Sequence, residues 1–439
     1  MSRRLLVLCY FFPPHGGGGV PRVLGYTRYL PDHGWDCTVV CAGAEDFWIT
    51  DRSLLERVRP ETEVVRVEGG SALSAWLRLR PRDRGQRSPR TFGFLRGLAD
   101  WWLVPDPYVG WARRAGAAAA RLMRERRFDA VLSSSPPDSV HLAALGLGRG
   151  RAPWVVDFRD PWMGLNRRTP PTAWHARRHA ALEARVVAGA DLVVAAARSH
   201  AEQLERATPR PRRVVHLPNG FEPAAATSAP ESAPSAEPPA ASSFFRIVYT
   251  GTLARVPDVD TFLDALHEML ARRPEARRRV RVVLAGPFET GYRDRAIALG
   301  LTPGIVSFEG PRPYAETRAL QASADLLALW KMAGMTATVP GKLYEYLDTG
   351  RPVLALLEPA DEAGELVERA GGVRVDPRDR TGVVDALDRA YLAWREHGRA
   401  PAARPAWIED HTRAALAGRL AAELDRAVAE TAVAGGPRP

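Results

Sequence analysis

The 439-residue chain has only three cysteines, Cys9, Cys37 and Cys41. All three lie in apolar segments near the N-terminus without the spacing of a metal site, so we expect buried free thiols and no disulfide framework. No apolar run approaches the roughly 18 residues that a membrane-spanning helix needs, and the first residues resemble a strand and a loop more than a signal peptide. The sequence therefore predicts a cytoplasmic protein without a membrane span.

Acidic residues are also in deficit, because 51 Asp and Glu face 61 Lys and Arg and give a net charge of +10 with His neutral. Such a charge favours encounter with nucleotide sugars, phospholipid headgroups or nucleic acid. No basic-aromatic motif or zinc-finger spacing accompanies it, so we expect no nucleic-acid partner. Six arginines crowd the stretch from Arg78 to Arg90. That stretch is either a solvated loop or, with aromatic residues on both sides, a peripheral contact with the inner face of the membrane.

The length exceeds what one hydrophobic core usually supports, so we expect two domains. Apolar residues 5–11 predict a buried strand, residues 21–34 a helix and residues 38–41 a second strand. This alternation continues through the first half and restarts after a segment from Ala224 to Ser243 that is nearly all Ala, Ser, Pro, Thr and Glu. We predict Rossmann-like domains at 1–222 and 244–404, a linker at 223–243 and a C-terminal helical segment at 405–439.

A short helix after Pro340 carries the clearest chemical signal. Its first turn holds Gly341, Lys342 and Leu343, Glu345 follows about one turn later, and Gly350 can end the helix before an apolar strand. An exposed helix N-terminus beside a lysine attracts phosphate or diphosphate. Glu345 can then accept hydrogen bonds from the hydroxyls of an attached ribose or sugar.

Four glycines lie between the first predicted strand and the first helix, namely Gly16, Gly17, Gly18 and Gly19. Their lack of Cβ atoms lets backbone N–H groups approach a ligand closely, although a structural turn is the alternative. The spacing differs from the dinucleotide-binding fingerprint, and no acidic residue ends the second strand. A dehydrogenase is therefore disfavoured.

Polar residues follow two later strands of the first half, where open α/β sheets bind ligands. The candidates for contact with an acceptor are Ser134, Ser135, Asp138 and His141 after one strand, and Asp157, Arg159 and Asp160 after the next. The alternatives are a packed or capping histidine for His141 and a structural ion pair between Arg159 and an aspartate. In the second half, strand ends supply Gly251, Thr252 and the nearby Arg255, then Gly286 and Pro287, then Gly310 and Tyr314; structural turns are the alternative for the last two groups.

Four segments together resemble the family 4 glycosyltransferases: YFFPPHGGGGVPR, SSPPDSVH, DFRDPW and VPGKLYEYL. The resemblance implies an α/β protein of the GT-B fold, with two Rossmann-like doubly wound parallel-sheet domains facing a central cleft. It also implies that the glycine loop lies under the sugar and diphosphate, that His141 contacts the transferred sugar, and that the stretch from Glu309 to Tyr314 receives the nucleobase. In this family the last helix commonly crosses back onto the first domain.

The sequence departs from the usual family pattern at three positions. Ala337 stands where the first of two glutamates is expected, and Thr252 and Pro257 stand where an arginine and a lysine usually hold the diphosphate. Only Arg255 remains as a nearby cation. A branch of the family with the pattern Pro-x-Lys-x-x-Glu-Tyr also lacks the first glutamate, and this chain resembles that branch.

The resemblance implies a retaining transfer of a sugar from a nucleotide diphosphate, UDP or GDP, to a small-molecule acceptor, with a lipid-linked acceptor of surface polysaccharide as the alternative. Lys342 and Arg255 would stabilise the departing phosphate, while His141 and Glu345 would position the sugar and the ribose. We expect no metal and no cofactor besides the nucleotide sugar as co-substrate, because no carboxylate cluster has metal spacing. A non-catalytic nucleotide-sugar-binding protein, an epimerase and a pseudo-sugar coupling enzyme remain open.

Overall fold

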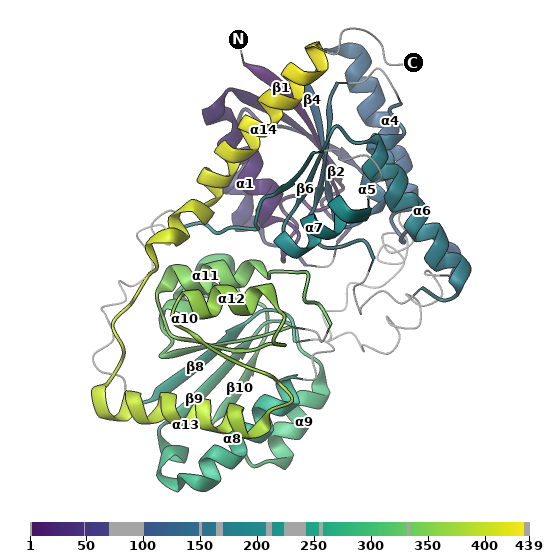
Figure 1. The fold of residues 1–439 in the computed structure, drawn as a ribbon. Coiled ribbons are helices and arrows are strands. Elements are labelled where there is room, and N and C mark those ends of the chain that lie inside the picture. Colours follow the sequence, from purple (N-terminus) through teal and green to yellow (C-terminus); the bar gives the residue numbers. More distant parts are fainter. Residues whose placement is uncertain are drawn as a thin grey trace. The chain divides into compact units, whose positions relative to one another are not determined.

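The computed structural model divides the chain into two compact units (Figure 1). Unit 1 comprises Met1–Asn219 and Arg413–Pro439, and unit 2 comprises Gly220–Thr412. The structure describes residues 2–47, 49–69, 101–148, 152–163, 170–207, 213–223, 243–253, 258–331 and 334–433. The arginines from Arg78 to Arg90 and Arg255 therefore lie outside the described residues. The segment from Ala224 to Ser243 also lies outside them, apart from Ser243 itself.

Unit 1 contains a parallel sheet with seven described strands in the order β3-β2-β1-β4-β5-β6-β7. The strands are β1 (Arg3–Cys9), β2 (Trp35–Ala42), β3 (Glu63–Val67), β4 (Ala130–Ser135), β5 (Trp154–Phe158), β6 (Leu192–Ala195) and β7 (Arg213–His216). Val7 of β1 pairs with Val39 on one side and with Leu132 on the other. The order reverses between β1 and β4, which is where open α/β sheets bind ligands.

Helices cover both faces of this sheet. They are α1 (Pro21–Tyr29), α4 (Val109–Glu125), α5 (Ser139–Leu145), α6 (Ala173–Gly189), α7 (Arg198–Ala207) and α14 (Arg413–Val433), with 3-10 turns η1 (Leu30–His33) and η2 (Arg52–Arg57). One apolar core joins the sheet to α4, α5, α6 and α7. A second core joins it to α1 and α14, where Leu416, Leu420 and Leu424 pack among the residues of α1 and the sheet.

Two helices expected from the sequence are interrupted. The helix expected over residues 21–34 ends at Tyr29 and continues as the turn η1, which contains Pro31; proline has no N–H to extend an α-helix. The helical segment near the C-terminus begins with a 3-10 turn, η5 (Ala406–His411), and Thr412 is extended before α14 begins. Apolar spacing alone does not reveal such breaks.

Unit 2 contains a parallel sheet with six described strands in the order β10-β9-β8-β11-β12-β13. The strands are β8 (Phe245–Thr250), β9 (Val280–Ala285), β10 (Val306–Glu309), β11 (Leu326–Trp330), β12 (Val353–Leu356) and β13 (Val373–Val375). The helices are α8 (Asp258–Arg272), α9 (Thr290–Ala298), α10 (Tyr314–Ala322), α11 (Gly341–Thr349), α12 (Glu362–Arg369) and α13 (Arg380–His397), with the turns η4 (Pro274–Arg278) and η5. In Figure 1, α8, α9 and α13 lie on one face of this sheet and α10, α11 and α12 on the other.

These sheets confirm the predicted class of two Rossmann-like, doubly wound α/β domains. In both units every pairing between the described strands is parallel, so polar residues that follow different strands are gathered at one edge. Within the described ranges, no helix combines the length and the apolar character needed to cross a bilayer.

Candidate active site

The N-terminus of α11 is the best-defined candidate in unit 2. Pro340 is the N-cap with extended backbone, Gly341 begins the helix, and no side chain caps this end. At the other end Gly350 has a φ of +65°, the left-handed conformation in which glycine commonly ends helices. The first turn carries Lys342, whose side chain is half-buried, and Leu343, which is fully buried and anchors the helix in unit 2.

Lys342 is held by an aromatic pair from the sheet below. Its Nζ donates a 2.6 Å hydrogen bond to the hydroxyl of Tyr249 and lies 4.0 Å from the centroid of that ring. The Tyr249 ring stacks on Trp330 with 4.4 Å between centroids, and its hydroxyl donates to the carbonyl of Thr252. Desolvation lowers the pKa of Lys342 to about 7, although the nearby Glu345 carboxylate opposes this change. An anion bound beside Nζ would favour the charged form of this lysine further.

Two of the predicted glycines are required by close packing at the same edge. Gly251 follows β8 with a φ of +129°, and a Cβ atom there would lie 2.5 Å from Nζ of Lys342. Gly286 follows β9 with a φ of +136°, and its Cβ would lie 2.1 Å from the carbonyl oxygen of Gly251. Only glycine fits at both positions, so the end of β8 lies close to the lysine and the end of β9 lies close to Gly251.

Glu345 is buried one turn after Lys342 and is oriented by side chains of α10. Its Oε2 accepts a 3.1 Å hydrogen bond from Nε2 of Gln321, and that amide also donates to Oγ1 of Thr250. Arg318 fixes Gln321 by donating to its Oε1 at 2.7 Å and also donates to the carbonyl of Glu345. Gln321 and Arg318 could not be predicted from the sequence, because nothing in the pattern of α10 shows which residue of α11 it will contact.

The remaining predicted residues of unit 2 lie at the ends of neighbouring strands. Pro287 accepts a backbone hydrogen bond from Leu253 through its carbonyl, which ties the loop after β9 to the loop after β8. Gly310 follows β10, and a Cβ there would meet nothing within 4 Å. Tyr314 begins α10. The strand order places the end of β10 two strands away from the end of β8.

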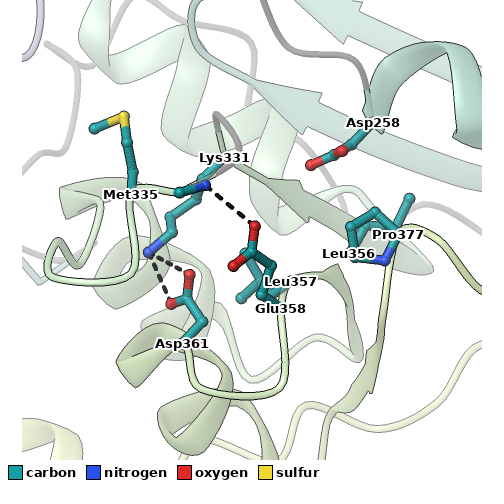
Figure 2. A pocket seen from close by; sticks show the side chains of 9 residues that line it. Asp258, Lys331, Met335, Leu356, Leu357, Glu358, Asp361 and Pro377 are labelled. Carbon is teal, nitrogen blue, oxygen red and sulfur yellow. Dashed lines mark hydrogen bonds and ion pairs between the residues drawn. The ribbon is translucent and has the colours of Figure 1, made fainter. Parts of the chain in front are cut away.

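A small pocket at the ends of β11 and β12 contains a charged cluster that no spacing in the sequence indicates (Figure 2). Nζ of Lys331 donates to Asp361 at 2.6 to 2.7 Å and to the carbonyl of Thr338 at 2.6 Å. This buried ion pair therefore holds the loop that leads into α11 against the start of α12. Asp258 and Glu358 line the same pocket, and desolvation raises the pKa of Asp258 to about 7, helped by the negative charges of Glu358 and Asp376.

In unit 1 the glycine loop follows β1 and precedes α1. The N–H of Gly16 donates to the carbonyl of Ile49, and Gly17 has a φ of +83°. A Cβ at Gly19 would lie 2.8 Å from the ring of Phe11, whereas a Cβ at Gly18 would meet nothing within 4 Å. The loop is therefore packed at its ends and open at Gly18.

Two predicted residues of the DFRDPW segment have different surroundings. Asp157 is fully buried and forms an ion pair with Arg22, which also donates to the carbonyls of Leu217 and Pro218. The hydroxyl of Ser134 donates to the same carboxylate at 2.6 Å. Asp157 thus joins β4, β5 and α1. Arg159 is half-buried, donates to the carbonyl of Gly18 at 2.5 Å and approaches Asp160 at 3.4 Å.

His141 is buried at the start of α5 between the sheet and Trp162. Its Nδ1 lies 2.8 Å from Oγ of Ser133, which also accepts a hydrogen bond from the indole N–H of Trp154. Burial lowers the pKa of His141 to about 3, so the ring is neutral. When Ser133 donates to Nδ1, the ring proton is on Nε2, and this nitrogen has no hydrogen-bond partner in the described part of the chain.

The buried hydroxyls of Ser135 and Ser139 also lack partners among the described residues. Asp138, which precedes α5, is buried as well. The structure therefore brings Ser134, Ser135, Asp138 and His141 to one strand end, as predicted from their spacing, but turns Ser134 toward Asp157.

Comparison with known proteins identifies both halves. The family described as "Glycosyl transferase 4-like domain" matches residues 17–220, and the family described as "Glycosyl transferases group 1" matches residues 245–392. The chain is a glycosyltransferase with the GT-B fold. The matches cover the glycine loop from Gly17 onward, the His141 segment and the α11 site, so the predicted enzyme class is confirmed. No protein with a curated description matches the glycosyltransferase in sequence.

Solved structures agree with this fold. HepE of Anabaena, solved with UDP and glucose, is 17% identical with a TM-score of 0.60, covering 99% of this chain and 100% of HepE. WaaG, a glycosyltransferase involved in lipopolysaccharide biosynthesis, is 16% identical with a TM-score of 0.57 and coverages of 98% and 100%. Sucrose-phosphate synthase of Thermosynechococcus elongatus is 14% identical with a TM-score of 0.58 and coverages of 98% and 98%. At these identities the likeness concerns the fold of the glycosyltransferase.

Proposed function

We propose that this glycosyltransferase moves a sugar from a nucleotide diphosphate sugar to an acceptor with retention of the anomeric configuration. The proposal rests on the surroundings of Lys342. This lysine is desolvated and lies at a helix N-terminus that no side chain caps. Two glycines with positive φ, Gly251 and Gly286, end the strands at the same edge of the sheet. These groups together favour a diphosphate. Glu345 lies one turn further along α11, held through Oε2 by Gln321, and is the group that we assign to the ribose.

The chemical step that we propose is departure of the nucleotide diphosphate from the anomeric carbon. Negative charge then grows on the β-phosphate, where Lys342 and the N–H groups of α11 stabilise it. The acceptor oxygen forms the new bond to the anomeric carbon on the face that the diphosphate leaves, and the departing phosphate accepts the proton of that hydroxyl, so no separate protein base is needed. We propose that Arg255, outside the described residues, adds a second cation and that the reaction uses neither a metal nor a cofactor.

For the acceptor side we propose the unit 1 residues. His141 would donate through Nε2 to a hydroxyl of the transferred sugar, since that N–H has no partner among the described residues. Arg159 would be the cation of this side; it donates to the carbonyl of Gly18 in the glycine loop, and we assign that loop to the sugar and diphosphate of the donor. Asp160, beside Arg159, completes this side.

The donor base, UDP or GDP, and the acceptor are the finer parts of the proposal. HepE was solved with UDP and with UDP-glucose, which favours testing UDP first. A small-molecule acceptor is our first choice, and sucrose-phosphate synthase is a protein of similar fold that fits this choice. A lipid-linked acceptor is the alternative, and WaaG, involved in lipopolysaccharide biosynthesis, is a protein of similar fold that fits the alternative. In either case we place the enzyme in the cytoplasm, with the arginines from Arg78 to Arg90 as a candidate peripheral contact with the membrane.

The first test is thermal stabilisation by UDP, GDP, TDP, ADP and their sugar conjugates. A ligand at a hundred times its dissociation constant adds about 2.7 kcal/mol to the free energy of unfolding. We expect one base to stabilise the protein and Lys342→Ala to lose that stabilisation, while Arg278→Ala, at an exposed arginine of η4, should keep it. Equal stabilisation of the Lys342→Ala protein would contradict the diphosphate site.

The second test separates transfer from binding alone. Ala337 stands where the family has a glutamate, which is the feature that favours a non-catalytic binding protein as the rival. Slow hydrolysis of the stabilising nucleotide sugar in the absence of acceptor, detected as release of nucleotide diphosphate, supports an enzyme. Tight binding without hydrolysis, and without transfer across an acceptor panel, supports the rival.

A further inference from the structure

Unit 1 leaves three tryptophan side chains in water. Trp101, Trp102 and Trp174 are 53%, 83% and 61% exposed. Tryptophan has a large apolar surface, and leaving three indoles uncovered is unfavourable unless another surface covers them. The patch therefore indicates an interaction that is not made within the described chain.

A histidine fixes two of these indoles next to each other. The ring of His175 lies edge-on to Trp101 at 5.5 Å and to Trp174 at 4.8 Å. Its Nε2 donates to the carbonyl of Trp101 at 3.2 Å, and its Nδ1 lies 2.8 Å from the hydroxyl of Thr172, the N-cap of α6. The start of α6 and the chain at Trp101 are thus joined into one surface.

The exposed face of α6 continues from Trp174 as a basic stripe. Arg177 and Arg178 follow three and four positions later, and Arg185 follows eleven positions later, so all three lie on the same side of the helix as Trp174. All three are exposed and make no hydrogen bond or ion pair with any described residue. The one acidic residue of α6, Glu183, is half-buried.

We propose that this surface, consisting of Trp101, Trp102, Trp174, Arg177, Arg178 and Arg185 and named here the α6 face, docks on an anionic lipid bilayer. Indoles favour the headgroup level of a bilayer, where the ring is desolvated and its N–H stays hydrated. Arginines at the same level meet lipid phosphates and the negative surface potential. The α6 face offers both groups, because Trp174, Arg177, Arg178 and Arg185 are exposed on one helix. In Figure 1, α6 lies on the outside of unit 1.

Charge argues for a bilayer over a second copy of the chain as the occupant. A symmetric dimer through the α6 face would bring Arg177 and Arg178 toward their own equivalents with no exposed acid on α6 to compensate. The inference is independent of the sugar that the enzyme transfers. It also differs from the Arg78 to Arg90 contact, because every residue of the α6 face is described.

The test is cosedimentation of the full chain with vesicles of phosphatidylcholine alone and of phosphatidylcholine mixed with phosphatidylglycerol. We expect binding to the mixed vesicles only, weakening as salt is raised. Arg177→Glu with Arg178→Glu should lower the partition coefficient by about 25-fold or more, since each basic residue near such a surface contributes roughly a fivefold effect. Trp174→Ala should lower it by about tenfold.

Matched controls lie in unit 2. The charge control is Arg278→Glu with Arg279→Glu, which makes the same change in charge at two exposed arginines, one at the end of η4 and one directly after it. The apolar control is Ile297→Ala, which removes an exposed apolar side chain from α9. Both controls should partition like the unaltered protein. Far-ultraviolet circular dichroism and melting temperature check the fold of each variant, because the altered side chains are exposed.

Three results would overturn the proposal. They are absence of binding to mixed vesicles, equal binding to both kinds of vesicle at all salt concentrations, and α6-face variants that bind no more weakly than the controls. If a variant fails to fold, the salt and lipid dependence of the unaltered protein still decides. A change of oligomeric state in Trp174→Ala without a change in vesicle binding would assign the α6 face to a second copy and reject the bilayer.

Discussion

Lys342 should take up a proton when a nucleotide sugar binds. The pKa of Lys342 is lowered to about 7 by desolvation, so near neutral pH about half of the unliganded protein carries a neutral amine there. A diphosphate beside Nζ favours the charged form and raises this pKa. Binding then requires the ammonium form, which predominates below pH 7 and is lost as the pH rises through 7.

The size of the effect follows from this pKa. If the bound pKa exceeds 9, the proton uptake per ligand is about 0.1 at pH 6, about 0.5 at pH 7 and about 0.9 at pH 8. The association constant should fall roughly tenfold between pH 6 and pH 8. A nucleotide sugar is a better ligand than a free nucleotide diphosphate for this purpose, because its diphosphate is esterified at both ends and has no terminal phosphate that titrates near pH 6.

Isothermal titration calorimetry in two buffers of different ionisation enthalpy gives the proton count directly. Lys342→Arg is the control, since a guanidinium stays charged and should bind without proton uptake at any of these pH values. Tyr249→Phe removes the hydroxyl that accepts the 2.6 Å hydrogen bond from Nζ of Lys342, and it should change the number of protons taken up per ligand without abolishing the uptake. Zero proton uptake at pH 8, together with an association constant that does not vary with pH, would refute the reasoning.

Three further predictions concern stability and packing. Burial lowers the pKa of His141 to about 3 and the pKa of His200 to about 4, below the ordinary 6.5. The unfolded chain therefore binds more protons between these values, and stability is lost as the pH falls. Urea denaturation should show about 4 kcal/mol less stability at pH 5 than at pH 7, and about half of that loss in His141→Gln. Gly251→Ala places a Cβ 2.5 Å from the lysine of α11, so donor affinity should fall about tenfold or more in a binding assay, with the exposed Gly291→Ala as the control. Lys331→Met leaves the carboxylate of Asp361 buried without its cation and should lower the free energy of unfolding by about 3 kcal/mol, as measured by thermal denaturation. Adding Asp361→Leu should restore part of this stability. Equal stability of the single and double variants would contradict this account.

The sequence allowed prediction of the features that depend on local spacing. The strand and helix alternation predicts two parallel sheets, and parallel strands necessarily collect Gly251, Gly286 and the residues after β4 at their sheet edges. Proline and glycine at the two ends of α11 gave the position of the helix and of Lys342. Family resemblance then gave the enzyme class that the comparisons confirm.

Partners that are distant in sequence could not be predicted in the same way. Arg22 and Asp157 are 135 positions apart, and Gln321 meets Glu345 across the packing of α10 on α11. Burial of these pairs depends on the tertiary structure, and the amino-acid composition does not reveal which distant residues are buried together. Likewise, Trp101 and Trp174 are 73 positions apart, and the ring of His175 contacts both of them.

The chain enters unit 2 once, at Gly220, and returns to unit 1 at Arg413. Unit 2 is therefore one continuous piece, while unit 1 is completed only by α14, which follows unit 2 in the chain. Until that helix has left the ribosome, the apolar face of α1 and the sheet that receives Leu416, Leu420 and Leu424 stays uncovered. A chain ended before Arg413 would keep every proposed donor-binding residue of unit 2 and yet expose half of the core of unit 1, so premature termination should yield an aggregating protein and not a smaller enzyme.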